Sequence, residues 1–208
     1  MTKLKWGMIG GGEGSQIGPA HRLGAQADAR FEMVAGALDH RADAGRDYAQ
    51  RLGIAADRAY GDWQEMLSGE KGRADRVDLV TVATPNATHF EITKSFLEAG
   101  FNVLCEKPMT MTVEEGEEIV KVVEKTGKIC AVNYCYSAYP MVRQARAMVK
   151  AGELGEIRVV QVEYPQDWLA EPLEKTGQKQ ADWRTDPKRS GAGGCIGDIG
   201  THAYNLAD

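Results

Sequence analysis

The sequence has no apolar run long enough to cross a membrane. A membrane-spanning helix needs about 20 consecutive apolar residues, whereas 26% of these 208 residues are charged and interrupt the apolar stretches. The first residues, MTKLKWGMIG, contain only a short apolar run that ends in glycines, unlike a secretory leader. We therefore expect no membrane partner and a cytoplasmic location.

An excess of positive charge is also missing. The chain has 25 Lys and Arg residues against 30 Asp and Glu residues, and its formal net charge is −5 at pH 7. The two signs are interspersed, so the chain offers no basic stripe to neutralise the phosphates of a nucleic acid. The sequence predicts no nucleic-acid partner.

Cysteines in metal-binding patterns are absent as well. The four cysteines form no CxxC motif, and no histidine stands at zinc-finger spacing from Cys105, Cys130, Cys135 or Cys195. Structural zinc sites draw four Cys or His ligands from such patterns. We interpret the cysteines as reduced thiols and expect no metal site.

What the sequence does contain is a regular alternation of short apolar runs and longer segments of helical period. This alternation is typical of parallel β/α units. Strands are predicted at 4–9, 31–38, 78–83, 102–105 and 129–133, and helices at 18–27, 41–52, 62–68, 87–99 and 112–126. Asp62 and Thr112 stand at helix starts as N-cap residues, the latter with Glu115 three residues on. Residues 1–133 are therefore predicted to form an α/β domain with a doubly wound parallel sheet, a Rossmann fold.

Residues 134–208 follow a different pattern. An amphipathic segment at 139–151 precedes an alternating stretch at 157–164, which predicts a strand with one solvated face. Residues 165–197 contain prolines and a glycine cluster without a clear period, so mostly loop is expected there, before a final helix start. One strand and one helix cannot bury a sheet face. We expect an incomplete second domain of α+β type, and hence a piece of a longer protein or a truncated gene product.

The glycine-rich stretch MIGGGEGSQIGPAH, residues 8–21, lies between a predicted strand and a predicted helix. Glycines there allow a pyrophosphate to approach the backbone and the helix N-terminus. The spacing departs from the usual pattern, because Ser15 stands where the third glycine belongs. Either Ser15 serves there or, as we favour, the loop is longer and Gly18 is the packing glycine. A mobile turn is the alternative. The predicted cofactor contacts in this loop are Gly10, Gly12, Gly14, Ser15 and Ile17.

An acidic residue ends the second predicted strand, in VAGALDH. The carboxylate of Asp39 can accept hydrogen bonds from the ribose hydroxyls of a dinucleotide and would repel a phosphorylated ribose. It therefore favours NAD over NADP, although His40 and Arg41 beside it could hold a phosphate. A helix-cap role for Asp39 is compatible with this function.

Two further loops follow the third and fourth predicted strands, in VATPNATHF and VLCEKPM. Open α/β sheets bind ligands at the carboxyl ends of their strands. The cofactor contacts predicted here are Thr84, Pro85, Asn86, His89, Glu106 and Lys107. Lys107 would lie in a partly desolvated crevice, aimed by Pro108. The alternatives are a surface ion pair between Lys107 and Glu106, and a capping role for His89.

The last motif, GDIGTHAYNLAD, contains Asp198 and His202. On a helix, their four-residue spacing would place both side chains on one face. Histidine is a natural acceptor for the proton of an alcohol that is being oxidised. A metal site lacks an evident third ligand, and an ion-paired helix start is the plain alternative. Trp168, Tyr136 and Arg184 are candidates to line a substrate pocket or to pack beneath a long loop.

Together these motifs resemble the glucose-fructose oxidoreductase, inositol dehydrogenase and rhizopine-catabolism (Gfo/Idh/MocA) family. The resemblance covers the whole chain, through the glycine loop, TPNATH, EKP, AGELGEI and WRTDPKRSGAGGCIGDIGTH. It implies NAD as the cofactor, with NADP possible, in a Rossmann domain followed by a domain built on a large open sheet. The longer glycine loop departs from the family pattern and leaves the individual phosphate contacts open.

The resemblance also implies a function and a set of catalytic residues. Family members are NAD(P)-dependent oxidoreductases that act mostly on sugars, cyclitols and related polyols. Lys107 is expected near the nicotinamide ribose and the substrate hydroxyl, His202 is the expected acid/base, and Asp198 is expected to bind or orient the substrate. The second domain is expected to mediate homo-oligomers of the full-length protein. The alternatives are a glycosidase that retains NAD, as in some relatives, and a non-catalytic dinucleotide-binding protein.

Overall fold

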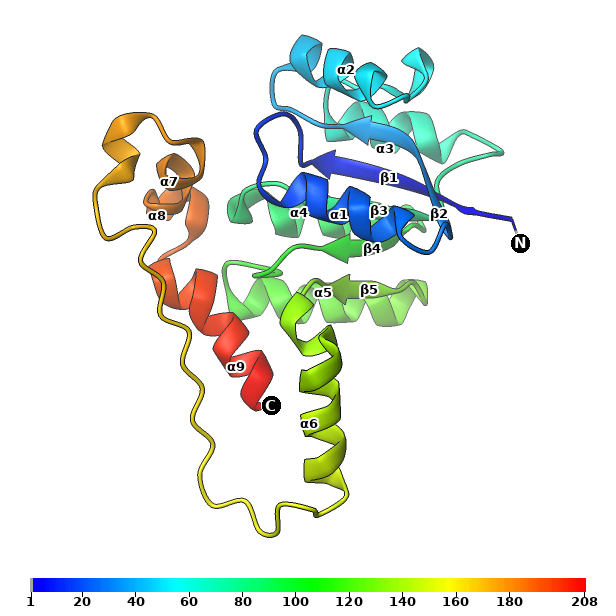
Figure 1. The fold of residues 1–208 in the computed structure, drawn as a ribbon. Helices are drawn as coiled ribbons and strands as arrows, with labels where there is room; N and C mark the ends of the chain where they lie inside the picture. The colour runs from blue at the N-terminus through cyan, green and yellow to red at the C-terminus, as the bar shows by residue number, and fades with distance from the viewer. Residues whose placement is uncertain (1) are drawn as a thin grey trace. The chain divides into compact units, whose positions relative to one another are not determined.

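A computed structural model describes residues 2–208 of the chain (Figure 1). The chain divides into two compact units, the first ending at Val132 and the second spanning Asn133–Asp208. Each unit has its own secondary structure and is described by itself. Within residues 2–208, no helix has the length and apolar character needed to span a membrane.

The first unit is built on a five-stranded parallel sheet with the strand order β2-β1-β3-β4-β5. Its strands are β1 (Leu4–Gly10), β2 (Phe31–Ala37), β3 (Leu79–Ala83), β4 (Asn102–Cys105) and β5 (Cys130–Val132). The chain turns back between β1 and β3, so the carboxyl ends of these two strands form the topological switch point of the sheet. The predicted α/β Rossmann fold is confirmed.

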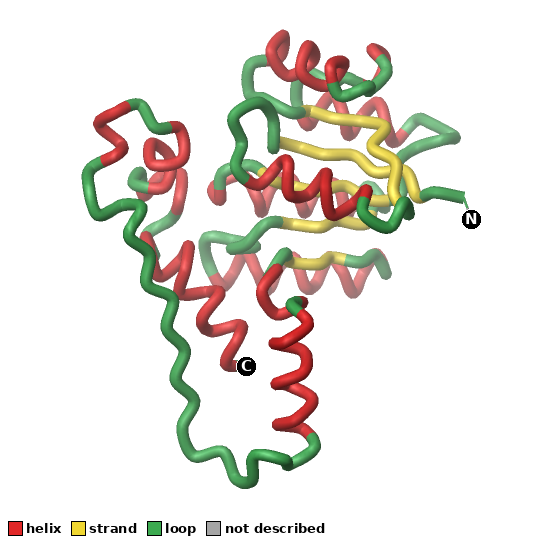
Figure 2. The backbone as a smooth tube through the Cα atoms, viewed as in Figure 1, coloured by secondary structure: helices red, strands yellow, loops and turns green. Residues whose placement is uncertain are grey.

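Five helices cover the two faces of this sheet (Figure 2). They are α1 (Ile17–Gln26), α2 (Ala42–Arg51), α3 (Trp63–Lys71), α4 (His89–Glu98) and α5 (Val113–Thr126). Short 3₁₀ turns, η1 (Ala56–Arg58) and η2 (Asn86–Thr88), precede α3 and α4. Both predicted caps are confirmed, because Asp62 accepts a hydrogen bond from the Glu65 amide and Thr112 accepts one from the Glu115 amide.

The core of the first unit consists of two apolar layers, one on each face of the sheet. Trp6, Met8 and Leu38 pack with Ala49 of α2 on one face. Side chains of α3, α4 and α5 pack on the other face, among them Met66, Phe96 and Ile119. The central strands are buried on both faces, which is why they read as nearly continuous apolar runs. These layers fix the carboxyl ends of the strands where the loops begin.

The second unit is helical in the part of the chain that the structure describes. Its elements are η3 (Cys135–Ala138), α6 (Pro140–Lys150), η4 (Leu173–Thr176), α7 (Lys179–Arg184), α8 (Pro187–Ser190), η5 (Ile196–Gly200) and α9 (Thr201–Ala207), of which η5 is a π-helical turn. Pro140 and Pro187 each stand in the first turn of a helix, where the missing N–H of proline has no cost.

The strand predicted at 157–164 is wrong for the described chain. This segment pairs with no strand among residues 2–208. An alternating pattern specifies which face of an extended segment is apolar, but a ladder also needs a neighbour to complete its hydrogen bonds. Val159 and Val160 are accordingly exposed.

The expectation of mostly loop at 165–197 is wrong in part. Two short helices, α7 and α8, begin within this segment, and local caps explain both. Gln178 accepts a hydrogen bond from the Ala181 amide, and Asp186 accepts one from the Lys188 amide. Pro187, one of the prolines of this segment, is the first residue of α8.

Candidate functional site

The glycine loop joins β1 to α1 and has no room for side chains at three of its positions. A Cβ atom would lie 2.5 Å from the Ala83 carbonyl oxygen at Gly10, 2.2 Å from the Leu38 oxygen at Gly12 and 2.1 Å from the Gly11 oxygen at Gly18. Only glycine satisfies such contacts with backbone oxygens, because the backbone cannot move aside. The loop therefore passes close to the ends of β3 and β2 and packs against the start of α1.

Gly18 and Ser15 make different contacts in this loop. Gly18 packs directly on Gly11 at the start of α1, whereas the Ser15 hydroxyl accepts a hydrogen bond from the Gly18 amide at 3.1 Å. The first turn of α1 contains no acidic side chain. A narrow glycine cradle beside the N-terminus of a ten-residue helix, at the switch point of the sheet, fits the pyrophosphate of a dinucleotide.

Asp39 follows β2, and the exposed fraction of its side chain is 6%. Its Oδ1 accepts hydrogen bonds from the backbone amide of Arg41 at 3.0 Å and from the Arg41 Nε at 3.2 Å, and it lies 3.1 Å from His40 Nδ1. Burial by itself would raise the pKa of Asp39, but the two Arg41 hydrogen bonds outweigh it and lower the pKa below its ordinary value. The carboxylate is therefore ionised at neutral pH and can accept from ribose hydroxyls.

His89 connects the two loops that follow β3 and β4. Its ring is 1% exposed, with Nε2 lying 2.8 Å from the Thr84 carbonyl oxygen and Nδ1 lying 2.7 Å from the Pro108 carbonyl oxygen. Burial lowers the pKa of His89, although the two carbonyl contacts oppose this effect. Beside it, Asn86 is buried in η2. Both nitrogens of the His89 ring thus contact backbone carbonyl groups of the two loops, and neither caps a helix.

Glu106 is buried and directly precedes Lys107. Its Oε1 lies 2.8 Å from Nε2 of His21 on α1, and its Oε2 accepts a hydrogen bond from the Lys107 amide at 3.2 Å. The Glu106 amide in turn donates to the Val82 carbonyl of β3. The alternative for this motif was a surface ion pair between Glu106 and Lys107. The Glu106 carboxylate is instead buried, and it contacts His21 and the Lys107 amide. His21 was not among the predicted site residues. The one feature of the sequence that could have indicated it is its place three residues after Gly18 on the helix that begins at the glycine loop.

In the second unit, His202 of α9 lies in an aromatic cluster and is 5% exposed. Its ring centroid lies 4.6 Å from that of Tyr136, 6.0 Å from that of Tyr134 and 6.3 Å from that of Tyr164. The hydroxyls of Tyr136 and Tyr164 lie 2.6 Å apart. This contact and burial raise the pKa of Tyr136, so its hydroxyl stays protonated at neutral pH.

Asp198 lies in the π-helical turn η5 and pairs with Arg184 of α7, whose Nε lies 3.2 Å from Oδ2 of Asp198. The Arg184 guanidinium also stacks on the ring of Trp183 at 4.3 Å and lies 5.8 Å from that of Trp168. That Asp198 and His202 share one helix face and converge on one substrate group stays a prediction. The two residues span the junction of a π-helical turn with α9, where the number of residues per turn differs.

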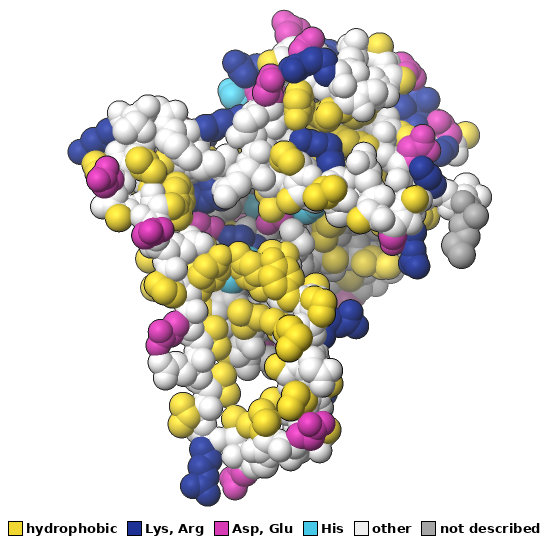
Figure 3. Space-filling model, in the orientation of Figure 1, with side chains coloured by type: hydrophobic (Ala, Val, Ile, Leu, Met, Phe, Trp, Pro, Cys, Tyr) yellow, Lys and Arg dark blue, Asp and Glu magenta, His cyan; other side chains and the backbone are white. Residues whose placement is uncertain are grey.

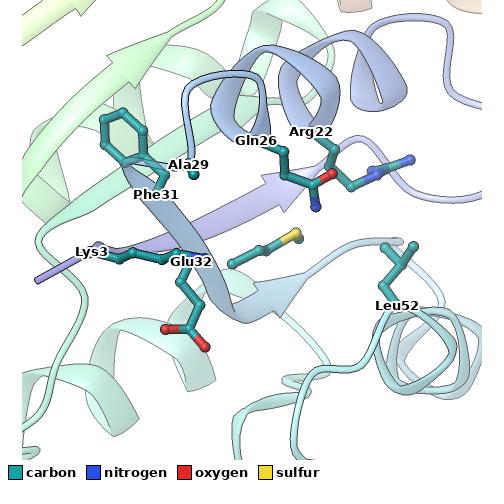
Figure 4. Close-up of a pocket in the computed structure, with 8 residues that line it drawn as sticks. Lys3, Arg22, Gln26, Ala29, Phe31, Glu32 and Leu52 are labelled. Carbon is teal, nitrogen blue, oxygen red and sulfur yellow. The ribbon is translucent and has the colours of Figure 1, made fainter. Parts of the chain in front are cut away.

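A cavity of about 320 Å³ lies between α1 and the end of α2, over the first half of β2 (Figure 4). None of the predicted site residues lines it; the lining residues are Lys3, Arg22, Gln26, Ala29, Phe31, Glu32, Met33 and Leu52. It includes the amino end of β2, whereas open α/β sheets bind their ligands at the carboxyl ends. The candidate site is therefore the loop edge described above.

Comparison with protein families gives two matches along the chain. Residues 4–134 match the oxidoreductase family with an NAD-binding Rossmann fold, and residues 142–208 match the GFO/IDH/MocA C-terminal domain. The first match confirms the predicted Rossmann fold and NAD as its cofactor.

Individual proteins show the same relationship. An uncharacterized oxidoreductase, YfiI of Bacillus subtilis, is 42% identical over 205 residues, covering 98% of this chain and 52% of that protein. Levoglucosan dehydrogenase of Pseudarthrobacter phenanthrenivorans is 30% identical over 214 residues, covering 100% of this chain and 51% of that protein. The chain thus spans about half the length of the curated relatives it matches.

A solved structure is also similar over nearly the whole chain. It is an inositol dehydrogenase homolog from Azotobacter vinelandii in complex with NAD+, with a TM-score of 0.94, 41% identity and coverage of 99% of this chain and 52% of that one. Its complex with NADH and myo-inositol gives a TM-score of 0.89 at 40% identity, with the same coverage. By its sequence, its fold and the order of its motifs, the chain belongs to the GFO/IDH/MocA oxidoreductase family.

Proposed function

We propose that the protein is an NAD-dependent dehydrogenase that oxidises a secondary alcohol of a sugar, cyclitol or related polyol. The observation that carries the proposal is the convergence of three loops at one edge of the sheet. The glycine cradle follows β1, the TPN loop follows β3 and the loop with Lys107 follows β4. The inositol dehydrogenase homolog solved with NADH and myo-inositol supports this reaction class.

The residues proposed to hold the dinucleotide come from all three loops. The glycine loop would bind the pyrophosphate through Gly10, Gly12, Gly14, Ser15 and Ile17, and Asp39 would bind the ribose hydroxyls. The remaining contacts are proposed for Thr84, Pro85, Asn86, His89, Glu106 and Lys107. When bound, NAD supplies the acceptor for the hydride that leaves the carbinol carbon. The ionised Asp39 favours NAD over NADP because it would repel a 2′-phosphate.

Three side chains are proposed to act on the substrate. His202 accepts the proton of the substrate hydroxyl, and its aromatic surroundings keep its ring in one orientation. The Lys107 ammonium stabilises negative charge as it develops on the alcohol oxygen. Asp198, held by Arg184, binds and orients the hydroxyl groups of the substrate. The paired hydroxyls of Tyr136 and Tyr164 can donate and accept hydrogen bonds beside His202.

The first experiment is a substrate panel at saturating NAD, with NADH formation followed at the nicotinamide absorbance band. Myo-inositol, levoglucosan, D-xylose and simple glucosides are the initial panel. The proposal expects steady NADH formation with at least one of them. Release of sugar from a glycoside without net NADH would instead indicate a glycosidase, and NAD binding without turnover of any alcohol would indicate a non-catalytic protein.

The proposed setting of the enzyme is a cytoplasmic homo-oligomer. Met141, Val159 and Val160 of the second unit are exposed, and apolar side chains gather on this unit in Figure 3. A contiguous exposed apolar patch supports association, because such patches mark protein–protein interaction surfaces. Light scattering across a concentration series tests this proposal: a mass that stays at the monomer value would contradict it.

A further inference from the structure

Lys107 lies between two residues whose polar groups contact buried histidines. On its amino side, Glu106 spans from the His21 ring to the Lys107 amide, since one carboxylate oxygen lies 2.8 Å from His21 Nε2 and the other accepts from the Lys107 N–H. The side chains of His21 and Glu106 are only 7% and 10% exposed. The backbone of Lys107 is therefore connected to helix α1 through a single buried carboxylate.

On the carboxyl side of Lys107, the Pro108 carbonyl oxygen lies 2.7 Å from Nδ1 of His89. The opposite nitrogen of the same ring contacts the Thr84 carbonyl, so His89 bridges the loops that follow β3 and β4. His89 is the first residue of α4 and is almost fully buried. Its position is therefore set by the core of the first unit rather than by the loop that it holds.

We propose that His21 and His89 are positioning residues that fix the backbone on either side of Lys107, an inference that rests on the proposed catalytic role of Lys107. Lysine has a flexible four-carbon stem, so its ammonium can be directed only if the backbone that carries it is fixed. A displacement of about 1 Å at a reacting group can cost about 100-fold in rate. The two histidines approach from different elements, α1 and α4, and together they restrict the loop from both sides.

The His21 contact also joins the two halves of the proposed site. Helix α1 begins at the glycine cradle, and His21 lies in its second turn, three residues beyond the packing glycine Gly18. Glu106 is the residue that directly follows β4. One buried pair thus holds the Lys107 loop in register with the helix that starts at the cradle.

The test uses variants that remove or keep the hydrogen-bonding atoms. His21→Leu removes the contact with Glu106, whereas His21→Gln keeps an N–H that can reach the carboxylate. His89→Phe keeps the ring shape without its nitrogens. Exchange of the Lys107 amide hydrogen, measured by NMR on the cofactor-free protein, reports whether Glu106 still holds that amide. We expect about tenfold faster exchange in His21→Leu, with near wild-type exchange restored by His21→Gln.

Steady-state kinetics supply the second measurement. We expect His21→Leu and His89→Phe to lower kcat by about tenfold or more. In His21→Leu, which changes none of the proposed cofactor contacts, the Kd for NAD measured by calorimetry should change by less than about threefold. Glu70→Gln is the matched control, because it removes the charge of another buried carboxylate, paired with Arg58, away from Lys107. This control should lower the melting temperature and leave kcat and the Lys107 amide exchange near their wild-type values.

The outcomes separate this inference from the proposed function. If no alcohol of the panel yields NADH, the proposed function fails. If Lys107→Ala leaves turnover unchanged, the proposed catalytic role of Lys107 fails, whatever the exchange data show. If Lys107→Ala abolishes turnover but His21→Leu and His89→Phe change neither amide exchange nor kcat more than Glu70→Gln does, the positioning role is contradicted. Should His21→Leu fail to fold, His21→Asn, whose shorter side chain does not reach Glu106, takes its place with the same expected results.

Discussion

At the scale of single residues, we propose that Asp39 and its two neighbours determine which cofactor the site accepts. The carboxylate is ionised, and the side chains of His40 and Arg41 are exposed by 85% and 68%. A 2′-phosphate would meet the negative charge first, although two groups able to bind a phosphate stand directly beside it. In this proposal, the charge of the Asp39 carboxylate makes the site favour NAD over NADP.

Asp39→Ser should therefore shift the cofactor preference toward NADP. Removing a repulsion of about 1.4 kcal/mol changes the ratio of kcat/KM for NADP to that for NAD by about tenfold, and we expect at least this change. Kinetics with both cofactors at one substrate concentration measure it. Asp43→Asn, on the exposed surface of α2, is the control and should leave the ratio as it is. An unchanged ratio in Asp39→Ser would remove Asp39 from cofactor recognition.

Cys105 gives a prediction that depends on pH. Burial raises the pKa of this thiol to about 12, so at pH 9 only about one molecule in a thousand carries the thiolate. The unfolded chain releases this proton near pH 8.5, and the stability that Cys105 contributes is therefore present below that pH and lost as the pH rises toward 12. Mass spectrometry after iodoacetamide treatment at pH 9 should show alkylated Cys195, which is exposed, and unmodified Cys105. Rapid alkylation of Cys105 in the folded protein would contradict the buried position.

The positions of the single site residues could be predicted from the sequence, but their long-range contacts could not. The glycines, Asp39 and Lys107 follow predicted strands, so their position at one edge of a parallel sheet is a local property of the chain. His21 contacts Glu106 across 85 residues of sequence, and no local pattern reports such a contact. The position of Lys107 directly after a predicted strand was predictable, whereas the partners that hold its loop were not.

At the scale of elements, helix starts followed from the sequence because their signals are local. The Thr112 hydroxyl accepts from the Glu115 amide, and the Glu115 carboxylate accepts from the Met111 amide. Such reciprocal bonds satisfy N–H groups that the helix leaves open. The predicted strand at 157–164 was wrong for a reason at the same scale, because its ladder requires a partner that the alternation cannot specify.

Thr112→Ala should destabilise the first unit by about 0.5 to 2 kcal/mol, since α5 would lose its N-cap. Urea denaturation followed by circular dichroism measures the loss as a lower midpoint with an unchanged slope. Glu117→Ala, on the exposed side of the same helix, is the control and should change the free energy of unfolding by less than about 0.5 kcal/mol. Equal effects of the two substitutions would mean that the cap bond does not stabilise the helix.

At the scale of the whole molecule, cofactor binding should be visible as stability. A ligand that binds only the folded state at 100 times its Kd stabilises it by about 2.7 kcal/mol, so NAD should raise the melting temperature. Gly12→Ala places a Cβ against the Leu38 carbonyl oxygen at the cradle and should abolish most of this shift. Gly24→Ala, at an open position within α1, should retain the full shift. A full NAD shift in Gly12→Ala would place the cofactor elsewhere.

The fold of the first unit was predictable at this scale because each strand, helix and turn carries its own signal and all of them specify one parallel sheet. The structure of the second unit was less predictable from the sequence. Its helical turns depend on single caps such as Asp186, and the surroundings of His202 depend on tyrosines that are distant in the sequence. The motifs therefore predicted the family, and the contacts around the motifs came from the structure.

The central claim is that Lys107 stabilises charge on a substrate alcohol at an NAD site. Turnover of the best polyol by wild type and Lys107→Ala, at saturating NAD and with the NAD Kd measured in parallel, tests it most directly. We expect kcat to fall by about 100-fold or more while the NAD Kd changes by less than about threefold. A kcat equal to that of the wild type would contradict it.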